Sequence, residues 1–400
     1  MCPRLARRDL LRGGAAALAG SLTGCLSALP PLGGAQTYGR IDVPPADPPD
    51  YRRWLPAPGA VDGAGDYPFV AARPGTADAG DPEEFLGRRA ALVVEQDYLG
   101  VPFEAYDRFV ATPYATVVEG EFGAETVADA LLGGGYARDG SVRGYDLFAR
   151  SDVSRRAAVR DGTVVWTSAL RTDRADLEAV VETGAGDRRR YHEVSDAVAA
   201  VTEAAGASRQ VLCAPELLSF HETAAYGADS FRFGPSATYQ VITLRFPAGR
   251  VPSVETIERR YRAAHTWTEA AASLDAVVDG RTATVEARVP RRSAESLSPV
   301  EDPPQVTWGA SHDAERRTVT FRHEAGDPVD AGILWGDVDT ERRPGEVTET
   351  ALFSGSDRVG PGDTGTVDLH GVGDPTHASV VVIPDPADVA FRTLFTYGLE

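Results

Sequence analysis

The sequence contains no lysine and no asparagine, and all 40 of its basic residues are arginine. The missing lysine excludes a phosphate-binding P-loop and Schiff-base chemistry, and the missing asparagine excludes N-glycosylation. Cysteine is also scarce, with 3 in 400 residues, so we expect no disulfide framework. Beyond residue 25 no apolar run approaches the roughly 20 residues that a membrane-spanning helix needs.

Acidic residues outnumber basic ones 59 to 40, which gives a formal charge of −19. Such a surface repels phosphate, so we exclude nucleic acid as a partner. Without residues 1–24 the chain would keep 36 arginines against 58 acids, a net charge of −22. In about 1 M salt the Debye length falls to about 3 Å and this charge is screened. The composition therefore resembles that of proteins from extremely halophilic archaea. A GC-rich genome is the alternative, but it does not explain the excess of acids.

The first 25 residues have the three parts of an export signal. A basic start contains the adjacent Arg7 and Arg8, a small-residue apolar stretch ends at Gly24, and Cys25 follows. The arginine pair resembles a twin-arginine signal, and residues 22–25 (LTGC) resemble a lipobox. The resemblance implies cleavage after residue 24 and lipid attachment to Cys25. We therefore expect a protein on the extracytoplasmic face of the cell membrane, with the membrane as a partner through this lipid anchor.

Composition divides the rest of the chain into four segments. Residues 25–50 are rich in proline and glycine, and proline pairs stiffen a chain, so this segment is predicted to be a tether. An α+β body is expected over residues 51–292. Residues 293–304 have the composition of a linker, and residues 305–400 form a β-rich unit.

Within the body, two stretches have a similar order of elements. Each has a β-branched strand that ends in phenylalanine, then a helix, then a hairpin with an Asp-Gly turn. The strands are residues 114–122 and 239–246. The helices begin at 125 and 254, and the turns are at 161–162 and 279–280. We interpret them as duplicated strand–helix–strand–strand units over residues 88–205 and 206–292. Because the spacing differs, chance similarity of small α+β units is the alternative.

The last hundred residues contain short strands separated by glycine, proline and aspartate, a pattern that predicts an antiparallel β-sandwich. Residues 318–330 and 359–364 resemble the C-terminal β-sandwich of haloarchaeal pilins and many surface lipoproteins. Upstream, residues 54–56, 119–122 and 144–146 resemble haloarchaeal twin-arginine lipoproteins with no assigned activity. Neither resemblance implies a catalytic residue.

No motif for chemistry is complete. His192-Glu193 and His221-Glu222 each begin a zinc motif, but Asp196 and Ala225 stand where its second histidine would be. The alternating acids at 337, 339 and 341 lack the glycine of a calcium loop, so a solvated loop is our interpretation. Cys213 lies in an apolar context, which predicts a buried, inert thiol. We expect no catalytic residue, no metal and no cofactor.

Arginine and tyrosine gather at 188–191 (RRRY) and 259–262 (RRYR). They could form a surface for anions or carbohydrate, although ion pairing with the excess acids is the ordinary interpretation. We expect a binding or surface-interaction module whose partner is another surface protein or a small ligand. The alternatives are an extracytoplasmic hydrolase, which needs converging carboxylates of raised pKa, and a solute-binding component of a transporter, which needs a deep cleft between lobes.

Overall fold

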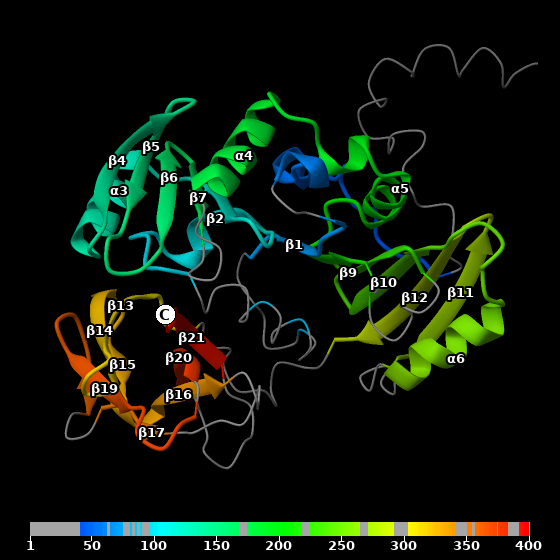
Figure 1. Cartoon of the computed structure of the whole chain (residues 1–400). Coiled ribbons are helices and arrows are strands. Elements are labelled where there is room, and N and C mark those ends of the chain that lie inside the picture. Colours follow the sequence, from blue (N-terminus) through cyan, green and yellow to red (C-terminus); the bar gives the residue numbers. More distant parts are fainter. Residues whose placement is uncertain are drawn as a thin grey trace, which may run out of the picture.

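The structure is a computed structural model that describes residues 41–61, 65–74, 96–167, 174–215, 224–264, 271–291, 303–340, 350–353, 357–373, 375–382 and 392–399, with Asp81, Phe85, Arg89 and Leu217. The predicted signal peptide with Arg7 and Arg8, the lipidation site Cys25 and most of the predicted linker lie outside these residues. The fold is α+β and rich in antiparallel sheet (Figure 1).

One antiparallel sheet of 12 strands runs through the whole body, in the order β11-β12-β10-β9-β8-β1-β2-β3-β7-β6-β5-β4. Its central seam joins β1 to β8, with Phe69 opposite Cys213. The strands are β1 (Phe69–Ala72), β2 (Tyr106–Ala111), β3 (Thr116–Gly120), β4 (Ala137–Val142), β5 (Tyr145–Ala149), β6 (Arg156–Arg160), β7 (Thr163–Trp166), β8 (Gln210–Ala214), β9 (Tyr226–Phe233), β10 (Ala237–Arg245), β11 (Ser273–Asp279) and β12 (Thr282–Pro290).

Helices cover both faces of this sheet (Figure 1). α4 (Arg174–Ala185) and α5 (Asp196–Ala205) pack on one face, and α3 (Ala124–Gly133) and α6 (Val254–Ala264) pack on the other. Successive strand residues point to opposite faces, so Val117 packs with α4 while Val118 packs with α3. Because both faces are buried at β3 and β7, these two strands contain consecutive apolar residues rather than alternating ones.

Glycines end α3. The N–H of Gly134 donates to the main-chain oxygen of Ala130 at 2.9 Å, and Gly135 has a φ of +87°. A residue with a side chain would be strained in that left-handed conformation. The chain therefore leaves the helix here and turns back into β4.

The C-terminal unit contains three antiparallel sheets that share one hydrophobic core. In that core Phe321 meets Phe395 edge to face, with ring centroids 6.0 Å apart. The sheets are β13-β14-β19, β15-β18 and β17-β16-β20-β21, formed by β13 (Val306–Asp313), β14 (Thr318–Gly326), β15 (Val329–Asp330), β16 (Leu334–Thr340), β17 (Thr350–Ala351), β18 (Arg358–Val359), β19 (Thr364–Asp368), β20 (Pro375–Val382) and β21 (Arg392–Gly398).

One interpretation from the sequence is corrected in this unit. Asp337 and Asp339 do not lie in a solvated loop but in β16, where they pair with Ser379 and His377 of β20. Asp337 is buried, with 8% of its surface exposed. Glu341 lies outside the described residues.

The chain contacts the body before the expected start of the body at residue 51. The main-chain oxygen of Pro44 accepts a hydrogen bond from Arg232 at 3.1 Å, and Asp47 forms a β-bridge with Ala207. Residues 44–47, at the end of the predicted tether, therefore pack against the β8–β9 region. The longest α-helix in the described part of the chain, α4, has 12 residues, and no helix there could cross a bilayer.

Candidate functional site

A pocket of about 650 Å3 lies beside the loop that joins α4 to α5. This volume is in the range that holds small-molecule ligands. Two stretches of chain that are far apart in sequence line it: Ala57, Pro58, Gly59, Ala60 and Asp66 from the N-terminal side, and Arg188, Arg189, Tyr191, Val194 and Ser195 from the loop.

Backbone hydrogen bonds join these two stretches. The N–H of Ala57 donates to the main-chain oxygen of Arg189, and the N–H of Tyr191 donates to that of Leu55, both at 2.9 Å. The 3-10 helix η3 (Pro58–Ala60) follows directly, and Pro58 occupies its first position, where no backbone N–H is needed. The two sides of the pocket are therefore fixed relative to each other.

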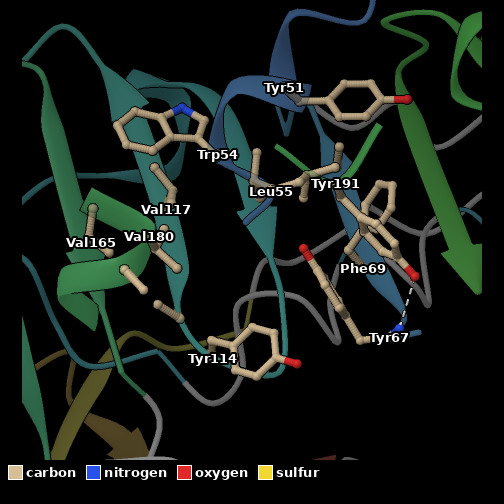
Figure 2. Close-up of a cluster of buried hydrophobic side chains, with 14 of the residues drawn as sticks. Tyr51, Trp54, Leu55, Tyr67, Phe69, Tyr114, Val117, Val165, Val180 and Tyr191 are labelled. Carbon is tan, nitrogen blue, oxygen red and sulfur yellow. Dashed lines mark hydrogen bonds between the residues drawn. The ribbon is translucent and has the colours of Figure 1, made fainter. Parts of the chain in front are cut away.

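Tyr191 forms the buried base of the pocket. Its ring stacks on that of Tyr67 with centroids 4.5 Å apart (Figure 2). The Tyr191 hydroxyl accepts a hydrogen bond from the N–H of Tyr67 at 3.2 Å and donates to Oδ1 of Asp66 at 2.8 Å. Burial and the Asp66 carboxylate raise the pKa of Tyr191, so the phenol stays protonated and positions that carboxylate.

The two arginines that line the pocket have different surroundings. The guanidinium of Arg188 is already hydrogen-bonded within the protein. Its Nε donates to Oε2 of Glu182 at 2.5 Å, and its Nη1 donates to the main-chain oxygen of Ala60 at 2.6 Å. Arg189 is exposed, and its guanidinium donates only to the main-chain oxygen of Glu193, at 3.2 Å. Within the described residues, Arg189 has no carboxylate partner.

The remaining lining is small or apolar. Val194 is 44% exposed, and it is one of two exposed large apolar side chains in the described part of the chain. Its neighbour Ser195 caps α5 by accepting a hydrogen bond from the N–H of Val198 at 3.3 Å. The cap fixes where α5 begins, so Val194 stays at the pocket rather than in the helix.

His192 lies in the same loop, in the 3-10 helix η5 (Tyr191–Glu193). Its Nδ1 is buried and has no hydrogen-bond partner in the part of the chain that the structure describes. Partial burial, assisted by the positive charge of Arg52, lowers the pKa of His192. The imidazole is therefore neutral at neutral pH.

Of the two incomplete zinc motifs in the sequence, the one at His192 lies in the loop beside the pocket. His221 lies outside the described residues. His323 is buried against the Trp308 ring, with centroids 5.3 Å apart, and its Nε2 is 2.9 Å from the main-chain oxygen of Asp327. No group of three or more His, Cys, Asp or Glu side chains in the described residues could hold a metal ion. Cys213 is buried, as its apolar context predicts, and burial raises the pKa of its thiol.

A carboxyl pair lies elsewhere, where Asp275 of β11 faces Glu286 of β12. Burial and the Asp275 charge raise the pKa of Glu286, whereas Arg232 lowers it. Glu286 is 7% exposed, and neither carboxyl group lines the pocket. The pair is therefore part of the packed sheet.

Sequence reasoning identified one side of this pocket and missed the other. The RRRY run at 188–191 drew attention to the loop, and ion pairing is indeed correct for Arg188 but not for Arg189. Nothing in the sequence pattern indicates that residues 57–60 and Asp66 lie opposite this loop. In the second run, Tyr261 is fully buried and donates to Gln240 Oε1 at 2.5 Å, so it is a core residue.

No protein-family model matches the chain, and no curated protein matches it. Among solved structures, the chain is similar to TP0453 in crystal form I at 11% identity, over 60% of this chain and 94% of that chain, with a TM-score of 0.37. Crystal form IV of TP0453 gives 10% identity and a TM-score of 0.36 over 61% and 96%.

Proposed function

We propose that this chain is a binding module whose ligand occupies the pocket between residues 57–60 with Asp66 on one side and the α4–α5 loop on the other. The observation that supports this function is the lining itself. Exposed Val194 and Arg189, which has no carboxylate partner among the described residues, both line the same pocket. A ligand that covers Val194 and pairs with Arg189 would gain apolar burial and a charged hydrogen bond.

We also propose that the module is anchored outside the cell. The twin arginines Arg7 and Arg8 would direct export, and lipid on Cys25 would attach the mature chain to the membrane. About 18 residues would then separate the lipid from the part of the chain that packs on the body, which begins near Pro44. In an extended form at about 3.3 Å per residue they would reach roughly 60 Å, which limits how far Pro44 could lie from the membrane surface.

A hydrolase and a solute-binding component of a transporter are the alternative functions. For a hydrolase, two carboxylates would have to meet at the substrate, and Asp66 is the one carboxylate among the described residues that line the pocket. For a transporter component the same pocket would be the solute site. Neither alternative has a supporting observation that the binding module lacks.

Two finer features of the fold are proposals as well. The strand order supports a duplication, because β1 and β8 are each followed by a hairpin, a helix and a second hairpin that returns to the first. The pairs β6–β7 and β11–β12 would correspond, with β4–β5 inserted in the first copy. The shared core of the C-terminal sheets supports a β-sandwich.

A pocket-filling variant tests the binding function. A Cβ on Gly59 would meet no atom within 4 Å, so Gly59→Trp fills space at the pocket without disturbing the backbone. Thermal unfolding of the mature chain in molar KCl would be followed with a panel of amino acids, peptides, sugars and organic acids. We expect a member of the panel to raise the Tm of the wild type and not that of Gly59→Trp.

The matched control is Gly373→Trp, because Gly373 is also exposed and a Cβ there is equally unobstructed, but it lies in the C-terminal unit. This variant should respond to ligand as the wild type does. A ligand-induced shift that persists in Gly59→Trp, or a panel that shifts no Tm at all, would contradict the proposed function.

A further inference from the structure

Two opposite charges in the pocket have no ion-pair partner within the described residues. Asp66 is exposed and accepts one hydrogen bond, from the Tyr191 hydroxyl. Arg189 is exposed and donates to one backbone oxygen. Although both line the same pocket, they form no ion pair with each other. Each charge is therefore available to a ligand at a different place on the pocket surface.

The third charged side chain among the described lining residues, Arg188, is already neutralised by Glu182. Asp66 and Arg189 are thus the two charges of the described lining that can select the ligand. A ligand with only an anionic group would pair with Arg189 but leave Asp66 beside it as a repulsive charge. A ligand with only a cationic group would pair with Asp66 but would be repelled by Arg189.

The lining that accompanies these charges is apolar or small, with Ala57, Pro58, Ala60 and Val194. In concentrated salt an exposed ion pair contributes little, so affinity requires that apolar contacts exclude water around both pairs. We propose that the pocket binds a small apolar zwitterion, an amino acid or short peptide with free termini, whose ammonium group meets Asp66 and whose carboxylate meets Arg189. This inference rests on the proposed function and specifies its ligand class.

Calorimetric titration of the mature chain in molar KCl with leucine, leucyl-leucine and trileucine tests the inference and shows which separation of charges fits. The peptide that binds best would then be titrated with its amine acetylated, with its carboxyl amidated, and with both ends blocked. We expect each single block to weaken binding about three- to tenfold, the range of a partly shielded ion pair.

Variants assign each end of the ligand. Asp66→Asn should bind the acetylated and free peptides equally, and Arg189→Gln should bind the amidated and free peptides equally. Asparagine keeps an acceptor for the Tyr191 hydroxyl, so the local structure is preserved. Asp129→Asn and Arg250→Gln, which change exposed charges on α3 and before α6, are the controls and should behave as the wild type.

The outcomes separate this inference from the proposed function. Equal binding of the free and doubly blocked peptides, lost in Gly59→Trp, would overturn the zwitterion and retain the pocket. Absence of heat with all three zwitterions, while another panel compound shifts the Tm through the pocket, would do the same. Peptide binding that survives in Gly59→Trp would overturn both.

Discussion

Arg150, which follows β5 in the large sheet, donates from Nη1 to the main-chain oxygen of Trp308 in the C-terminal unit at 3.0 Å. Its Nε and Nη2 donate to the two carboxylate oxygens of Asp152 at 2.9 and 2.6 Å, and Glu324 of β14 lies 3.8 Å away. The guanidinium is 1% exposed. A buried charge, each of whose nitrogens has a hydrogen-bond partner, therefore connects the two parts of the molecule.

Arg150→Met should destabilise the protein by about 3 kcal/mol, because removing one member of a buried network leaves the others without a partner. Urea unfolding in molar KCl, followed by tryptophan fluorescence, measures this. The control is Arg138→Met, whose ion pair with Asp146 is 59% exposed on both sides and should cost less than about 1 kcal/mol. Equal losses for the two variants would show that the network does not stabilise the contact.

Gly184→Ala should destabilise the core where α4 passes Trp54. A Cβ on Gly184 would lie 2.0 Å from Cζ3 of the Trp54 ring, which is itself buried among side chains such as Val180 (Figure 2). Either the ring or the helix must move, and such overpacking costs about 1–3 kcal/mol or more. Gly133→Ala in α3 is the control, because its Cβ meets nothing within 4 Å, and it should be neutral or slightly stabilising. The same unfolding assay would refute the prediction if both variants were neutral.

Stability should fall as pH is lowered through the histidine range. The folded-state pKa of His192 lies below its ordinary value of 6.5, so between these two values the unfolded chain binds more protons than the native one. The contribution is present above pH 6.5 and is lost as the pH falls toward the folded pKa. His192→Gln should flatten this part of the pH profile of unfolding free energy. An NMR titration that gives a pKa above 6.5 would show that the sign is wrong.

Added salt should stabilise the fold over a wide range of salt concentrations. The self-repulsion of the net charge of −22 that the chain would carry without residues 1–24 is strong in dilute buffer and screened at molar salt. The Tm of the mature chain should therefore rise with KCl concentration well beyond physiological ionic strength. A Tm that stays constant from dilute to molar KCl would exclude the halophilic interpretation.

Cys25→Ser should release the protein from membranes. If lipid on Cys25 is the anchor, cells that express this variant will contain the protein in the soluble or secreted fraction, whereas the wild type sediments with membranes. Cys2→Ser is the control, because Cys2 would be removed with the signal and its loss should change nothing. Sedimentation of Cys25→Ser with membranes would disprove the lipid anchor.

Local sequence patterns predicted many of the elements of the body. The elements that depend on contacts between distant residues could not be predicted in this way. The Asp161-Gly162 and Asp279-Gly280 turns lie where predicted, and both glycines have positive φ values, 68° and 56°. The strand β1 was missed because it is four residues long and its partner β8 lies far along the chain. The pocket was half missed for the same reason, because Tyr191 and Asp66 are 125 residues apart. Sequence periodicity contains no information about such pairings.

The seam between β1 and β8 has a consequence for any attempt to divide this molecule. A fragment that ends before residue 210 would present β1 with its hydrogen-bonding groups uncovered on one side, and a fragment that starts there would do the same with β8. Bare edges of this kind recruit other chains and lead to aggregation. Either half would have to be capped by a designed strand or a charged edge before it could be handled alone.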